Sequence, residues 1–172
     1  MCGNETDRQT TLVIGGTGKT GKRVAERLAE KGHTVRIGSR ASIPAFDWDR
    51  EASWDAALEG VSSVYITYSP DLAMPGATDA ISALVWRARL QGVRRLVLLS
   101  GRGEKEAQAC EAIVQDSGLE WTIVRASWFN QNFSEGAFID MVMGGEITLP
   151  AGTTPEPFVD VDDIADVAVA AL

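Results

Sequence analysis

Residues Leu12–His33 read LVIGGTGKTGKRVAERLAEKGH, and this stretch decides the fold. It opens with the apolar, β-rich run Leu12-Val13-Ile14 and continues through closely spaced glycines. Apolar residues then recur at helical spacing between charged ones, so the order predicts a strand, a glycine turn and a helix that Gly32 ends. Glycines at such a turn let the backbone approach a pyrophosphate, and the helix N-terminus offers free N–H groups to it.

The glycines fit two spellings of a dinucleotide-binding turn, Gly16-x-Gly18-x-x-Gly21 and Gly15-x-x-Gly18-x-x-Gly21. A glycine turn that only packs the helix on the strand is the alternative to both. The strand before the glycines and the helix after them favour the nucleotide-binding interpretation.

An ATP-binding P-loop is a further possibility, because Gly18-Lys19-Thr20 matches the end of its motif. That motif, G-x-x-x-x-G-K-[ST], requires a glycine at position 13. Val13 stands there, inside the apolar strand, and a β-branched residue in a strand cannot make the required turn. The spacing therefore favours a dinucleotide over ATP.

The composition describes an ordinary globular chain of 172 residues, 45% of them hydrophobic, enough for one domain with a sizeable core. A formal net charge of −8 argues against general binding to nucleic acid or to anionic membranes, because neutralising phosphates needs a basic surface. The sequence shows no membrane-spanning stretch, and its polar start lacks the apolar core of a signal peptide. Cys2 and Cys110 have no metal-ligand spacing, so we expect no metal site and a reduced, cytoplasmic setting.

Beyond the opening unit, short β-rich runs alternate with helix-period segments. The predicted strands cover residues 34–38, 45–48, 61–67, 94–99, 121–124 and 158–159. The predicted helices cover a short segment around Trp54, then residues 77–90 and 104–117, and a last one from about 162. This alternation predicts an α/β fold with a doubly wound parallel sheet, a Rossmann fold. We expect one NAD(P)-binding domain over residues 11–172 after a disordered N-terminal segment, 1–10.

Ligands of such sheets bind at the carboxyl ends of the strands, so the residues there are candidates for the site. Ser39 and Arg40 follow the second strand, where an NAD enzyme usually places an acid and an NADP enzyme an arginine. No acid appears before Asp47, which predicts NADP, with NAD the less favoured cofactor. An exposed surface arginine is the alternative for Arg40. Asp47 and Trp48 are placed to flank the adenine, although Trp48 could equally pack in the core.

The next strand ends supply the middle and far parts of the predicted site. Thr67 and Tyr68 end one strand where the middle of the cofactor would pass, and Ser100 ends the next, before a glycine-rich loop. Tyr65, by contrast, alternates with its neighbours inside a strand and is expected to pack against a helix. The run after residue 125 is rich in aromatic and amide side chains, which suits a pocket wall, with a partly buried structural turn as the alternative. Its candidate substrate-pocket residues are Trp128, Phe129, Asn130 and Gln131.

Four stretches, LVIGGTGKTGKRVAERLAEKGHTVRIGSR, GVRRLVLLSGRGE, SGLEWTIVRASWFNQNFSEG and EPFVDVDDIADVAVAAL, resemble the NmrA-like branch of the atypical short-chain dehydrogenases/reductases. The resemblance runs in order from about residue 10 to residue 172. It implies a Rossmann domain that binds NADP or NAD, in a family that includes reductases of quinones, dyes and aromatic ketones and also non-catalytic redox sensors. It assigns the phosphate turn to Gly15, Gly18 and Gly21, with Thr17 and Lys19 beside it, and matches Arg40 to the basic residue at the 2′-phosphate.

The chain departs from this pattern in two respects. Short-chain dehydrogenases commonly pair a tyrosine acid with a lysine four residues later, and neither Tyr65 nor Tyr68 has such a lysine. Ser100, Tyr68 and Lys105 remain as weak catalytic candidates, and Lys105 is better explained as an exposed lysine on the first turn of a helix. Family members also usually continue past this length with a C-terminal part that closes over the substrate, so we expect that part to be short or missing.

Two functions follow from these features. The first is an NAD(P)H-dependent oxidoreductase that transfers hydride to a quinone-like or aromatic carbonyl acceptor, since a quinone needs little acid assistance. The second is a non-catalytic NADP(H)-binding sensor that acts through a regulatory protein partner. A homo-oligomer is compatible with either function.

Overall fold

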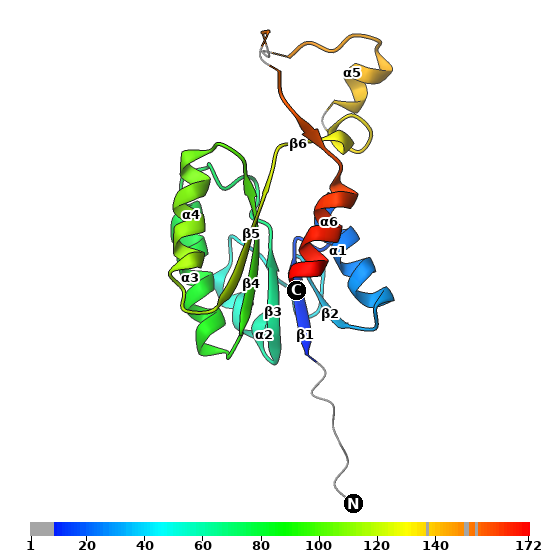
Figure 1. Ribbon diagram of the computed structural model, residues 1–172. Coiled ribbons are helices and arrows are strands. Elements are labelled where there is room, and N and C mark those ends of the chain that lie inside the picture. The colour runs from blue at the N-terminus through cyan, green and yellow to red at the C-terminus, as the bar shows by residue number, and fades with distance from the viewer. Residues whose placement is uncertain (1–8, 137, 150–151, 154) are drawn as a thin grey trace, which may run out of the picture.

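The computed structural model describes residues 9–136, 138–149, 152–153 and 155–172. Its main sheet has five parallel strands in the order β2-β1-β3-β4-β5 (Figure 1). The strands are β1 (Thr10–Ile14), β2 (Thr34–Gly38), β3 (Val61–Ile66), β4 (Arg95–Gly101) and β5 (Glu120–Ala126). The predicted Rossmann-type α/β fold is confirmed, and β1 extends two residues before the apolar run Leu12-Val13-Ile14. Apart from residues 9 and 10, the predicted disordered segment 1–10 lies outside the described residues.

Helices cover both faces of this sheet, as the doubly wound pattern requires. They are α1 (Lys19–Glu30), α2 (Trp54–Leu58), α3 (Ala77–Leu90), α4 (Lys105–Gln115) and α6 (Val161–Ala171), and the 3₁₀ turn η1 (Glu51–Ser53) leads into α2. In Figure 1, α3 and α4 lie on one side of the sheet and α1 and α6 on the other. The strands therefore bury side chains on both faces.

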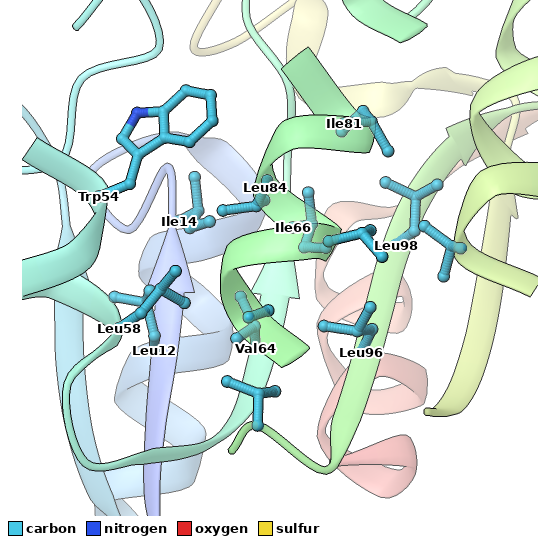
Figure 2. Close-up of a cluster of buried hydrophobic side chains, with 14 of the residues drawn as sticks. Leu12, Ile14, Trp54, Leu58, Val64, Ile66, Ile81, Leu84, Leu96 and Leu98 are labelled. Carbon is cyan, nitrogen blue, oxygen red and sulfur yellow. The ribbon is translucent and has the colours of Figure 1, made fainter. Parts of the chain in front are cut away.

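Alternation along the strands divides the core into two layers. Leu12 and Ile14 of β1 join Trp54 of α2 and Leu84 of α3 in one buried cluster (Figure 2). Val13, between those two β1 residues, joins the opposite cluster, under α1 and α6. Tyr65 belongs to that second cluster and is fully buried, so the expectation that it packs against a helix is confirmed.

The predicted strand at residues 45–48 was wrong. The segment is irregular, and no ladder joins it to β2. It is held by aromatic packing instead: the ring of Phe46 lies 5.6 Å from that of Trp54 and 5.0 Å from that of Trp48. The Phe46 N–H donates to the Ser39 carbonyl, which folds the segment back on the end of β2.

A small lobe follows β5 and lies beyond the carboxyl ends of the strands (Figure 1). It contains β6 (Trp128–Phe129), the 3₁₀ turn η2 (Asn130–Asn132), α5 (Ile139–Met143) and β7 (Phe158–Val159). The predicted short strand at 158–159 is thus confirmed, and it pairs in parallel with β6, which the sequence analysis did not anticipate. Among the described residues, no helix is both long and apolar enough to cross a membrane.

Candidate nucleotide-binding site

The glycine turn between β1 and α1 has the geometry of a phosphate cradle. Gly15 takes a left-handed φ of +72°, and its N–H donates to the Gly38 carbonyl over 2.9 Å. The Gly18 N–H donates to the Gly15 carbonyl over 2.8 Å, and Gly18 is the N-cap of α1. The first N–H groups of α1 have no carbonyl one turn earlier to bind, and they face this turn with the positive end of the helix dipole.

The contacts around these glycines favour the Gly15-x-x-Gly18-x-x-Gly21 form of the motif. A Cβ on Gly21 would lie 2.3 Å from the Gly15 carbonyl oxygen, so only glycine lets α1 sit this close to the turn. A Cβ on Gly18 would meet only that same oxygen, at 3.3 Å, and would otherwise enter open space. Gly16 instead packs beneath the Ile37 side chain. Gly15 and Gly18 thus line the cavity described below, while Gly21 lets α1 pack against the turn.

A cavity of about 750 Å³ runs from this turn along the carboxyl ends of β3, β4 and β5 to the small lobe. Its lining from the predicted site comprises Gly15, Gly18, Lys19, Thr67, Tyr68, Ser100, Trp128 and Phe129. Thr20, Asp71, Arg102, Glu104, Ser127, Asn132 and Glu156 also contribute to its wall. Thr17 is exposed beside the turn and is not in the wall. Residues far apart in the sequence thus meet where ligands of parallel sheets bind.

The residues predicted for the adenosine end lie outside this wall. Arg40 is exposed at the loop after β2, next to the half-buried Ser39, and no carboxylate of the described residues pairs with it. It therefore stays available to a phosphate. The Asp47 backbone carbonyl accepts a hydrogen bond from the Trp54 indole, while its side chain accepts one from the Asp49 N–H.

Trp48 does pack against the core, as one of its two interpretations proposed. Its ring meets those of Trp54 and Tyr68 at 5.4 and 4.9 Å, and its indole N–H donates to the Thr67 carbonyl. These contacts make Trp48 a support for the loop that carries Tyr68. Tyr68 itself is half-buried and lines the cavity.

The other two catalytic candidates differ in placement. Lys105 is exposed at the start of α4 and does not line the cavity. Ser100 lines it, but its hydroxyl donates to the Glu111 carboxylate over 2.6 Å. Glu111 also accepts hydrogen bonds from Arg125, which hold the pKa of its carboxyl below the usual value.

Glu111 was not predicted as a site residue, because the candidates were taken only from positions just after the strands. Glu111 is 2% exposed on α4, on the buried face of that helix with Ala107, Cys110 and Val114. An acidic residue at helical spacing among buried apolar ones was the available signal, since such residues are rarely buried unless paired.

The small lobe contributes the aromatic end of the cavity. The Trp128 ring stacks on that of Phe138 at 5.7 Å and 12°, while Trp128 remains half-exposed and lines the cavity. Of the predicted amides, Gln131 has a structural role, because it binds Asp160 and the Val161 N–H at the start of α6. Asn130 is exposed outside the wall, whereas Asn132 lies in it.

Charged side chains at this end were also missed. Arg102 bridges the strand ends, binding Ser127 at 2.8 Å and Glu156 at 3.3 Å. Burial and the neighbouring Asp71 raise the pKa of the Glu104 carboxyl, which lies over Gly101. No cluster of three or more possible metal ligands occurs in the part of the chain that the structure describes.

The fold and this cavity define a dinucleotide-binding Rossmann protein. Residues 15–172 match the family described as NAD(P)H-binding, and the chain belongs to that family. This confirms the predicted kinship with NAD(P)-binding proteins of the atypical short-chain dehydrogenase type.

Two curated relatives are oxidoreductases by name. The chain is 32% identical over 172 residues to the uncharacterized oxidoreductase YesF of Bacillus subtilis, an alignment covering 94% of this chain and 59% of that protein. It is 33% identical over 186 residues to agroclavine dehydrogenase of Claviceps fusiformis, covering 95% and 63% of the two. The chain thus spans about three fifths of the length of the curated relatives that it matches.

Solved structures agree on the fold. The triphenylmethane reductase of Citrobacter sp., solved with NADP(H), superposes with a TM-score of 0.70 at 19% identity, covering 94% of this chain and 64% of that one. Both relatives are oxidoreductases by name and share no named acceptor, so the comparisons support the class of NAD(P)H-binding oxidoreductases without a specific acceptor.

Proposed function

We propose that this chain carries the cofactor site of an NADPH-dependent oxidoreductase that delivers hydride to a quinone-like or aromatic carbonyl acceptor. The observation that supports it best is the continuity of the cavity, which joins the glycine turn at Gly18 to the aromatic wall at Trp128. A dinucleotide needs the first feature for its pyrophosphate, and a planar acceptor can use the second.

The residues present fit such a cofactor. Gly18 leaves open space beside the backbone, and Lys19 in the cavity wall offers a cation near the turn. We assign the 2′-phosphate that distinguishes NADPH from NADH to Arg40, which is exposed in the loop after β2, because a guanidinium can donate two parallel hydrogen bonds to a phosphate. When bound, the nicotinamide supplies the hydride; the chain's own residues bind it, orient it and exclude water.

The proposed acceptor follows from the two catalytic candidates that line the cavity, Tyr68 and Ser100. Tyr68 has no lysine beside it in the sequence pattern, and the Ser100 hydroxyl proton is engaged by Glu111. An acceptor that takes hydride without strong acid assistance suits this wall better than a simple ketone does. The Trp128 ring stacks on Phe138 and meets Phe158 at 6.3 Å and 65°, and its half-exposed remainder lines the cavity, where a planar acceptor can contact it.

Steady-state oxidation of NADPH by the protein, followed by its near-ultraviolet absorbance, tests the proposal. We expect turnover with quinones and aromatic carbonyls, and weaker turnover with aliphatic ketones. Trp128→Ala should raise KM for the planar acceptors and leave the Kd of NADPH unchanged. Turnover that prefers aliphatic ketones, or ignores Trp128, would contradict the assignment of the acceptor.

A non-catalytic sensor of NADP(H) redox state is the second candidate. The observation that favours it is that neither Tyr65 nor Tyr68 is followed four residues later by a lysine. A sensor would bind NADP⁺ and NADPH with different affinities and show no turnover with any acceptor in the panel. The same assay therefore separates the two functions.

A further inference from the structure

At the end of β4, hydrogen bonds join Ser100 to Glu111 and Arg125, and the proposed function does not explain why the Glu111 carboxylate is buried there. Ser100 is 4% exposed, and its Oγ donates to Oε1 of Glu111 over 2.6 Å. Glu111 is itself 2% exposed, and Arg125 on β5 places its Nε 2.9 Å from Oε1 and 3.1 Å from Oε2. Since Ser100 and Arg125 are partners in the strand register, one carboxylate on α4 holds the ends of two neighbouring strands.

Counting donors and acceptors fixes the direction of the hydrogen bonds among Ser100, Glu111 and Arg125. Arginine has donors only, and an ionised carboxylate has acceptors only. The single hydroxyl hydrogen of Ser100 must therefore point at Glu111, which leaves the lone pairs of Ser100 Oγ for the cavity that this residue lines. A hydroxyl that donates to a carboxylate is also a better acceptor, because hydrogen bonds in a chain polarise one another.

We infer that Glu111 is a positioning residue that makes Ser100 a hydrogen-bond acceptor for an N–H or O–H group of the bound nicotinamide nucleotide. The donors that the nicotinamide half offers are the carboxamide N–H₂ and the hydroxyls of its ribose. Ser100 then orients the cofactor and supplies no proton to the acceptor. This role rests on the proposed binding of NADP(H) in this cavity.

Ser100→Ala, Glu111→Gln and the double variant test the inference by calorimetric titration with NADP⁺. Ser100→Ala should weaken binding about three- to tenfold, the effect of one ordinary hydrogen bond. In Glu111→Gln, the two donors of Arg125 retain the amide oxygen, so the new NH₂ faces Ser100 and turns its hydroxyl hydrogen toward the ligand. We expect a similar loss, and a double variant no weaker than the worse single one.

A second nucleotide identifies the donor. The 3-acetylpyridine analogue of NADP⁺ keeps the carbonyl but lacks the carboxamide N–H₂. If Ser100 accepts from the carboxamide, Ser100→Ala will not weaken binding of the analogue. If Ser100 accepts from a ribose hydroxyl, Ser100→Ala will weaken both nucleotides alike. Either result supports an acceptor role for Ser100.

A pH profile separates positioning from a merely structural role. The charged and titratable groups close to the Glu111 carboxylate are Arg125 and the neighbouring Cys110 thiol. Arg125→Met leaves this buried carboxyl without its cation, so its pKa should rise. NADP⁺ affinity relative to the parent should then decrease as the pH is lowered and Glu111 takes up a proton. Arg95→Met breaks an exposed pair with Glu120 at the other end of the same strands and should show no such change.

Several results would overturn the inference. Unchanged NADP⁺ affinity in Ser100→Ala would show that Ser100 meets no ligand donor. Additive losses in the double variant, or full affinity in a folded Glu111→Gln, would show that Glu111 does not act through Ser100. A parent chain that binds neither NADP⁺ nor NADPH would remove the proposed function and this inference together. The other results would leave NADP(H) binding by the parent, and so the proposed function, intact.

Discussion

Gly15 at the end of β1 lies directly against Thr67 just after β3, so closely that a Cβ on Gly15 would fall 2.0 Å from Thr67 Oγ1. The same Oγ1 donates to the Ile14 carbonyl over 2.9 Å and so joins the ends of two neighbouring strands at the phosphate turn. Two sites predicted separately, the glycine motif and the threonine after a strand, are thus one structural unit.

Gly15→Ala should therefore destabilise the fold. The left-handed φ alone costs about 1–2 kcal/mol for a residue with a Cβ, and the overlap with Thr67 adds to it, so we expect a loss of about 2–4 kcal/mol. Gly32→Ala is the matched control, because Gly32 has a φ of +83° and open space around its Cα. Denaturant unfolding measures both, and equal losses would show that the contact with Thr67 carries no weight.

Arg40→Ala should remove most of the preference for NADPH over NADH. A charge-assisted contact to the 2′-phosphate corresponds to about 1.5–3 kcal/mol, and NADH cannot make it. Calorimetric titration of both nucleotides measures the preference, with the exposed Arg50→Ala as a control at a similar surface position. Equal affinities for NADPH and NADH in the parent protein would contradict the assignment of Arg40.

Tyr68→Phe should slow any reductase activity by less than about tenfold, because the phenyl ring keeps its packing on Trp48 at 4.9 Å. A general acid typically contributes about 10²–10⁴-fold, so its loss would be plainly larger. Single-turnover kinetics with saturating NADPH separates the chemical step from cofactor binding. A slowing of about a thousandfold with unchanged cofactor affinity would instead identify Tyr68 as the acid.

Tyr65→Phe should protect the protein against alkaline unfolding. Burial raises the pKa of Tyr65 to about 12, and the nearby Thr20 side chain, which does not reach hydrogen-bond geometry, lowers it only in part. The folded pKa lies above the unfolded value of about 10, so this stability is present below about pH 10 and is lost as pH rises toward 12. Unfolding measured at about pH 8 and about pH 11 should show a smaller decline for Tyr65→Phe than for the parent. Equal declines would mean that Tyr65 does not ionise on unfolding.

The alternation of strands and helices was predictable because it depends on local periodicity. The apolar residues of β1 and β3 already divide between two faces in the sequence, and the structure places them in two clusters accordingly. The strand predicted for residues 45–48 was wrong, because a β-rich run forms a strand only where a neighbouring strand pairs with it. Phe46 and Trp48 pack against each other instead, and Trp48 also packs against Trp54.

The site was predictable only in its local parts. The glycine turn and the residues just after strands can be predicted from their order along the sequence. Gly18, Thr67 and Ser100 were predicted in this way. Glu111 and Glu156 reach the site through tertiary contacts with Arg125 and Arg102, and no spacing in the sequence encodes those pairs. Gln131 was assigned to a pocket from its polarity, yet it binds the start of α6, a role that only the return of the chain reveals.

The most direct test of the central claim is a calorimetric titration of NADPH into the parent protein and into Gly18→Val. Gly18 has an ordinary φ of −82° and lines the cavity, so valine fits the backbone while its branches stand where the pyrophosphate would lie. We predict saturable binding of NADPH by the parent and a loss of at least about a hundredfold in the variant, more than one lost hydrogen bond would give, with an unchanged circular dichroism spectrum. Retained binding in Gly18→Val, or a parent that binds ATP but no nicotinamide nucleotide, would contradict the account.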